Sequence, residues 1–243
     1  MSFNDAIISY KKNISTAFSF ALLLVFVLPF VWLSNAFISS GTVLIDYGFL
    51  KEPILDAVLL LITSLVFLYF YSLFVCLMVF SVRKDLSNVK INYFLNEKIH
   101  KLAFKYFRFL AIFTVIAALV SSLLIDYGIP IEIINLILFI ISSSFLFLGQ
   151  TIVVDEESLS SSVLSNWDFI LKNFSDFILV IIIGAVSIFI LQLLEFVIDY
   201  FLLVGNFVSL LIALIFLVPF LEVLKTRIYM ERFELIKSYH STK

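Results

Sequence analysis

Long apolar runs separated by shorter polar segments dominate the chain. Each run reaches or approaches the ~18 residues that mark a transmembrane helix. Because a segment in lipid has to pair its own backbone groups, the pattern predicts an all-α, polytopic membrane helix bundle with six transmembrane helices. The predicted spans cover residues 16–38, 54–80, 107–125, 131–154, 177–200 and 202–224.

The first run also has features of a secretion signal. Lys11 and Lys12 precede it, and Ser34-Asn35-Ala36 imitates a cleavage site with small residues. The apolar run is longer than the core of a usual signal peptide, so we expect the helix to be retained.

One short motif recurs at the far end of successive spans. LIDYG occurs twice, at 44–48 and 124–128, and VIDYF follows at 197–201. Each copy follows an odd-numbered span and precedes an even-numbered one, which indicates an internal repeat. We read the motif residues as interface anchors, turn acids and helix ends. They are Asp46, Tyr47, Gly48, Asp126, Tyr127, Gly128 and Tyr200.

An amphipathic stretch precedes each odd-numbered span. In the third, apolar residues recur at helical spacing on one face, which is typical of a helix lying in the lipid headgroup plane. The sequence predicts three helical hairpins, each led by such an interfacial helix, within one integral membrane domain, 1–243. The expected units are 1–82, 83–156 and 157–225, followed by an amphipathic tail, 226–243. The apolar positions of the third stretch are Leu159, Val163, Leu164, Trp167, Ile170, Leu171 and Phe174.

Composition and charge sharpen this picture. Hydrophobic residues make up 63% of the chain and charged residues 14%, with a mean hydropathy of +1.15. A soluble domain has about 25% charged residues. Of the 16 Lys and Arg, all but Lys51 fall in segments on one side of the predicted topology, so both termini are expected in the cytoplasm of a cell-membrane protein. The net charge of −2 gives no reason to expect nucleic acid as a partner.

The best candidate for membrane-embedded chemistry is a polar stripe on the fifth span. Gln192, Glu195 and Asp199 share one helix face near its outer end. One interpretation is an outward-facing ion or proton site. The other is a polar stripe that faces a neighbouring helix near the headgroups, with Asp199 as the acid of the third IDY copy.

Three other features have two interpretations each. Ser142-Ser143-Ser144 suits either a polar pathway or close helix packing. Pro29 and Pro219 should kink the first and sixth spans, as a gate or as an ordinary membrane kink.

The predicted loop 81–108 carries a basic cluster that is explained either by contact with anionic lipid or by topology alone. Its members are Arg83, Lys84, Lys90, Lys98, Lys101, Lys105 and Arg108. The acids Asp155-Glu156-Glu157 precede a helix start, where the helix dipole favours them, with Ser158 as the expected N-cap.

The stretch 151–174 resembles a signature of prokaryotic six-helix membrane proteins. It is similar to the membrane domain attached to some glycerophosphodiester phosphodiesterases, and more loosely to Yip1-like families. Glu156, Ser158, Ser165 and Lys172-Asn173 fill the signature positions, and 226–232, with Tyr229, resembles the closing segment. The resemblance implies a membrane-embedded accessory or transport-associated part, and no enzymatic activity.

The sequence therefore favours a non-enzymatic membrane scaffold or accessory subunit, with a small transporter or channel as the alternative. His100 and His240 lie in different segments, and the chain has no phosphate loop or nucleophile elbow. We expect no catalytic residue, metal or cofactor. The expected partners are the lipid bilayer and other membrane proteins, and the oligomeric state is open.

Overall fold

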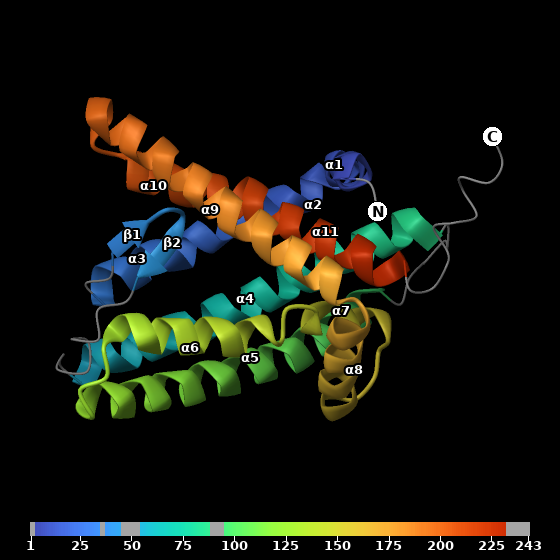
Figure 1. Cartoon of the computed structure of the whole chain (residues 1–243), viewed down its shortest axis with the longest axis horizontal. Coiled ribbons are helices and arrows are strands. Elements are labelled where there is room, and N and C mark those ends of the chain that lie inside the picture. Colours follow the sequence, from blue (N-terminus) through green and yellow to red (C-terminus); the bar gives the residue numbers. More distant parts are fainter. Residues whose placement is uncertain (1–2, 35–36, 45–53, 88–94, 232–243) are drawn as a thin grey trace.

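The computed structural model describes residues 3–34, 37–44, 54–87 and 95–231. It confirms an all-α helical bundle, to which one small β-hairpin is added (Figure 1). The first half comprises α1 (Phe3–Lys12), α2 (Ile14–Phe18), the 3-10 helix η1 (Ser19–Leu23), α3 (Leu24–Ser34), β1 (Phe37–Ser39), β2 (Thr42–Leu44) and α4 (Ile54–Ser87). The second half comprises α5 (Leu95–Asp126), α6 (Ile131–Ser143), α7 (Leu148–Val154), α8 (Leu159–Lys172), α9 (Phe174–Leu202), α10 (Gly205–Ile212), the π-helical η3 (Ala213–Leu217) and α11 (Val218–Glu231).

Within the described part of the chain, five helices are long and apolar enough to cross a membrane. They are Val58–Leu86, Lys98–Asp126, Ile131–Val154, Phe174–Leu202 and Gly205–Glu231. A sixth span results if the bent pair Asn4–Lys12 and Ile14–Pro29, which meet at 75°, counts as one.

Two predicted boundaries were wrong. The first predicted span, 16–38, runs past the end of α3 and into β1. A two-residue turn, Ser40-Gly41, joins β1 and β2, and both turn residues have positive φ, as a tight hairpin turn requires. The connection between the second and third spans, predicted as 81–108, is also shorter, since α4 runs to Ser87 and α5 starts at Leu95.

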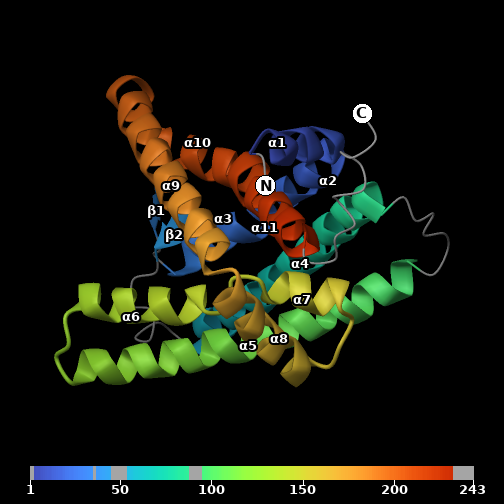
Figure 2. The same ribbon diagram turned by 45° about the vertical axis from the view of Figure 1, so that its right-hand side comes forward.

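The helices converge at one end of the bundle and separate toward the other (Figures 1 and 2). We call the first the basic end, because it carries Arg83, Lys98 and Lys225. We call the second the IDY end, because it carries Asp126-Tyr127 and Asp199-Tyr200. In both views the α9–α10 pair diverges from the α5–α6 pair toward the IDY end.

The core lies at the basic end, where α11 is the central helix. Half of the apolar window of the Gly205–Glu231 span is buried, against 6% for Lys98–Asp126. Residues 222–230 are all buried, and α11 packs mainly against α4 and α1. Residues 226–230 therefore continue α11 into the protein interior, where the sequence predicts an amphipathic tail.

The amphipathic stretches differ among the three predicted units. In the second unit, the part of the stretch that the structure describes, from Leu95 onward, is continuous with the span and forms α5. In the first and third units, α1 and α8 are separate helices, and Asn13 and Asn173 directly follow them. Each asparagine donates its side-chain amide to the carbonyl four residues earlier, at 2.9 Å and 3.0 Å. Both units thus have an asparagine between two helices with the same side-chain hydrogen bond, which we call an asparagine bend.

Helix α8 buries two polar residues together with Phe169 and Ile170, and exposes part of its apolar stripe. Ser162 and Asn166 are fully buried, whereas Leu164, Trp167 and Leu171 are 65%, 44% and 79% exposed. A helix of this kind presents its apolar face to lipid at the membrane interface.

Candidate functional site: a buried ion pair beside a broken membrane helix

The fourth predicted span is interrupted at its serine triplet. Helix α6 ends at Ser143 and α7 begins at Leu148, so the residues between them leave backbone groups outside the helical ladder. Asn166 of α8 satisfies two of these groups. Its Oδ1 accepts from the Phe147 N–H at 3.0 Å, and its Nδ2 donates to the Ser144 carbonyl at 2.7 Å. Non-helical backbone at membrane depth is tolerated where protein encloses it or where it lines a cavity.

A buried ion pair lies beside this break. Lys225 Nζ is 2.6 Å from Glu222 Oε1, one helical turn away on α11, and the two side chains are 10% and 3% exposed. Glu222 Oε2 accepts from Gln150 Nε2 at 2.9 Å. Lys225 also donates to the Leu146 carbonyl of the break at 3.3 Å. The ion pair therefore connects α11 to the interrupted span.

Gln150 is fully buried in the same cluster. Its Oε1 atom has no hydrogen-bond partner among the described residues. A buried amide oxygen without a partner is costly, which marks this cluster as more than a packing contact.

A cavity of about 320 Å³ reaches Lys225 from the side of the bundle. Of its lining residues, Phe139 and Ser142 are exposed on the outside, so the cavity opens between α5 and α6. Lys225 is the only charged residue among the lining residues. They are Tyr71, Tyr106, Phe109, Leu110, Phe113, Phe139, Ser142, Ser143, Phe145, Leu146 and Lys225.

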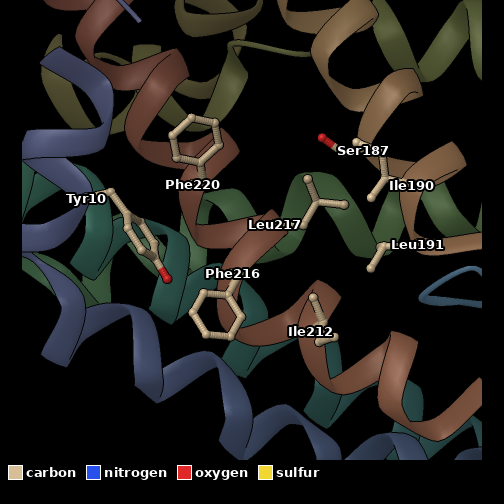
Figure 3. Close-up of a pocket in the computed structure, with 8 residues that line it drawn as sticks. All are labelled: Tyr10, Ser187, Ile190, Leu191, Ile212, Phe216, Leu217 and Phe220. Atoms are coloured by element: carbon tan, nitrogen blue, oxygen red, sulfur yellow. The ribbon is translucent and has the colours of Figure 1, made fainter. Parts of the chain in front are cut away.

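A second cavity, of about 330 Å³, lies on the opposite side of the last span, between α1 and α9 (Figure 3). Its lining is apolar apart from Tyr10 and Ser187. The Tyr10 hydroxyl donates to the Ile215 carbonyl at 3.0 Å. In a regular α-helix that carbonyl would accept the N–H of residue 219, which is proline and has none. Tyr10 thus supplies a hydrogen bond to a carbonyl that Pro219 deprives of its α-helical donor.

The acidic run at 155–157 joins four helices at the basic end. Glu156 pairs with Arg83 at 3.1 Å and with Lys98 at 2.6 Å. Asp155 Oδ2 accepts from the Tyr229 hydroxyl at 2.5 Å. Burial acts to raise the pKa of Glu156, but its hydrogen bonds and charge interactions with Lys98 and Arg83 outweigh burial and hold the pKa below its usual value. Ser158 caps α8, accepting from the Ser161 N–H at 3.4 Å.

The basic residues predicted as lipid contacts fall into two groups. Arg83 and Lys98 bind Glu156, as described above, and Lys105 donates to the Glu157 carbonyl at 2.9 Å. Lys84, Lys101 and Arg108 are exposed. Lys90 lies outside the described residues. Part of the cluster therefore holds the acidic run, and the exposed members remain candidates for anionic lipid.

Glu195, the centre of the predicted ion site, binds the turn of the β-hairpin. Its Oε2 accepts from the Ser40 N–H at 2.5 Å and from the Ser209 hydroxyl at 2.8 Å. Asp199 accepts from the Gly205 N–H at 2.6 Å, at the start of α10. Gln192 is exposed. The structure thus gives the two acids separate backbone partners.

The described motif residues lie at helix ends. Tyr127 and Tyr200 are 82% and 81% exposed, as interface anchors would be. Gly128 has a φ of +74°, and its N–H and that of Ile129 bond back to the carbonyls of 125 and 124 in a Schellman C-cap. Asp126 ends α5 and is exposed. Asp46, Tyr47 and Gly48 lie outside the described residues.

Sequence reasoning missed the ion pair. Glu222 lay inside the predicted last span, but that span was ended at 224, which placed Lys225 outside the membrane. The sequence does contain a sign of this pair. Glu222 and Lys225 have opposite charges and are three residues apart, which places them on one face of a helix. Asn166 was also missed, because it lies on the polar side of an amphipathic helix, where exposure is the usual expectation.

Compared with protein-family models, curated proteins and solved structures, the chain gives no significant match to any of them. The resemblance of 151–174 and 226–232 to six-helix membrane proteins stays a prediction. In the structure these two stretches touch, since the Tyr229 ring packs 4.7 Å from that of Phe169. Among the described residues, no cluster of His, Cys, Asp or Glu is placed to hold a metal ion.

Proposed function

We propose that this chain is a non-enzymatic scaffold or accessory subunit of a cell membrane, acting through contacts with lipids and other membrane proteins. The observation that best supports this proposal is the position of Glu195. Its carboxylate holds the Ser40-Gly41 turn against α10, so the acid that a transport site would need has a structural task. This favours the scaffold over the transporter.

Wide uncovered apolar faces support contacts with lipid or protein along the helices. On α5, Ile112, Ile116 and Leu119 are 54–61% exposed, and Phe196 and Phe201 of α9 are each 74% exposed. We propose that lipids or other membrane proteins cover these faces.

We further propose that the basic end faces the cytoplasm and that the chain arose by repetition of a hairpin unit. The distribution of Lys and Arg supports the orientation. The asparagine bends at 13 and 173 support the repeat, because each lies between an amphipathic helix and a span and makes the same side-chain hydrogen bond.

Reconstitution of the full chain in liposomes tests the scaffold function. We expect no proton or cation flux above that of empty liposomes, for the wild type and for Glu195→Gln alike. Glu195→Gln should lower the free energy of unfolding by about 1 kcal/mol, because it removes charge-assisted hydrogen bonds. Thermal unfolding in detergent micelles measures this loss.

Glu132→Gln is the matched control, since Glu132 is exposed in the first turn of α6. It should leave both flux and stability unchanged. Wild-type flux that Glu195→Gln abolishes and Glu132→Gln preserves would establish the transporter instead.

A further inference from the structure

We propose that the cavity beside the broken span binds the acidic headgroup of a bilayer lipid, with Lys225 as its cationic contact. The acyl chains would extend outward along the exposed faces of α5 and α6. This inference deepens the proposed scaffold function by naming a class of lipid partner, and it rests on the membrane location of the chain.

The cavity opens toward lipid rather than toward water. Phe139 is 53% exposed at its mouth, and the neighbouring Ile112 and Ile140 are 56% and 61% exposed. In a bilayer these apolar side chains face hydrocarbon. A molecule that enters between α5 and α6 therefore comes from the bilayer and carries an apolar part with it.

The buried end of the cavity calls for an acceptor with negative charge. A lysine ammonium has three N–H donors. Two of them are directed at Glu222 Oε1 and the Leu146 carbonyl, which leaves one for an occupant of the cavity. Tyr71 and Tyr106 line the same space and bring phenol hydroxyls, which donate to phosphate oxygens.

Glu222 does not occupy the cavity. Its two carboxylate oxygens accept from Lys225 and Gln150, on the α11 and α7 side of the ammonium. The glutamate thus fixes the direction of the lysine side chain. A cationic headgroup would meet the ammonium directly, so the cavity discriminates against choline-type lipids.

The volume fits a headgroup rather than a whole lipid. At about 30 Å³ per water-sized group, 320 Å³ holds on the order of ten heavy atoms. The aromatic walls formed by Phe109, Phe113 and Phe139 suit the glycerol and first methylene groups, while longer chains remain outside.

Native mass spectrometry of the full chain in detergent tests the proposal. The protein is incubated with equal amounts of phosphatidylglycerol and phosphatidylcholine of the same acyl chains. We expect retention of one phosphatidylglycerol in preference to phosphatidylcholine. The double variant Glu222→Gln/Lys225→Met should reduce phosphatidylglycerol retention about tenfold, because it removes a charge-assisted hydrogen bond.

Two further variants separate recognition from folding. Ser143→Phe leaves the ion pair in place and fills the cavity, and it should cause a similar loss. Lys172→Met removes an exposed lysine that is paired with Asp168, and it should retain phosphatidylglycerol like the wild type. Circular dichroism verifies that each variant is folded.

Equal retention of the two lipids by the wild type would overturn the lipid site. So would undiminished phosphatidylglycerol retention in a folded Ser143→Phe or double variant, or an equal loss in Lys172→Met. None of these results bears on flux. Conversely, flux that depends on Glu195 would overturn the scaffold function and leave the lipid site standing.

Discussion

At the residue scale, the junction of the β-hairpin with the last span depends on two small residues. Gly41 has a φ of +73°, and a Cβ there would lie 2.6 Å from the Ala213 Cβ and 2.9 Å from Leu191 Cδ1. Gly205 approaches α9 so closely that a Cβ would overlap the Glu195 carbonyl. These approaches bring Ser40 and Ser209 within reach of the Glu195 carboxylate.

A pair of glycine substitutions separates backbone strain from crowding. Gly41→Ala should lower the free energy of unfolding by about 1–2 kcal/mol through its positive φ. Overlap with Ala213 should add about 1–3 kcal/mol. Gly128→Ala is the matched control, because Gly128 has the same φ and open space around its Cα. Thermal unfolding in micelles measures both; equal losses would contradict the close packing of the hairpin turn.

At the element scale, interruptions of the helices mark the places where function-bearing groups gather. The α6–α7 break exposes carbonyls to Asn166 and Lys225. The π-helical segment η3 ends two residues before Pro219, and short π segments often accompany functional sites. The third IDY copy lacks its glycine, and Leu203 takes the left-handed conformation at the end of α9 instead, with a φ of +46°.

A double-mutant cycle tests the hydrogen bond that Tyr10 donates to the Ile215 carbonyl, four residues before Pro219. Tyr10→Phe should destabilise the wild type by about 1 kcal/mol, because the Ile215 carbonyl loses its donor. In a Pro219→Ala background the cost should fall, since the restored N–H of residue 219 reaches that carbonyl. Chemical unfolding in micelles gives both values.

Tyr69→Phe serves as the control for this cycle. Its hydroxyl is 3.0 Å from His100 Nδ1, away from Pro219. Its cost should be the same in both backgrounds. A Tyr10→Phe cost that is unchanged by Pro219→Ala would show that Pro219 does not create the need for the Tyr10 hydroxyl.

At the scale of the whole molecule, the two ends have different roles. The basic end holds the compact core and the paired charges, whereas the IDY end carries diverging helix pairs with exposed apolar faces (Figures 1 and 2). The buried core of the described residues is therefore concentrated at the basic end.

Cysteine labelling in intact cells tests the proposed orientation. Cys76 is fully buried and is replaced in a Cys76→Ser background. Tyr127→Cys should react with a membrane-impermeant maleimide added outside the cell, because Tyr127 is exposed at the IDY end. Lys172→Cys, at the basic end, should react only after the membrane is permeabilised. The reverse pattern would invert the topology.

The sequence by itself determined the membrane helices and their order. Apolar runs long enough to cross a bilayer have few alternatives to helix, because backbone groups in lipid have to pair within the segment. It also placed Ser158 as an N-cap, since capping depends on neighbours a few residues away.

Only the tertiary structure decided which polar groups meet. Glu195 binds a hairpin turn 155 residues away along the chain, and Lys225 reaches the Leu146 carbonyl across 79 residues. Such pairings depend on how helices pack in three dimensions, which the periodicity of one helix does not encode. For the same reason the polar face of α8, which sequence alone assigns to water, is the face that holds the broken span together.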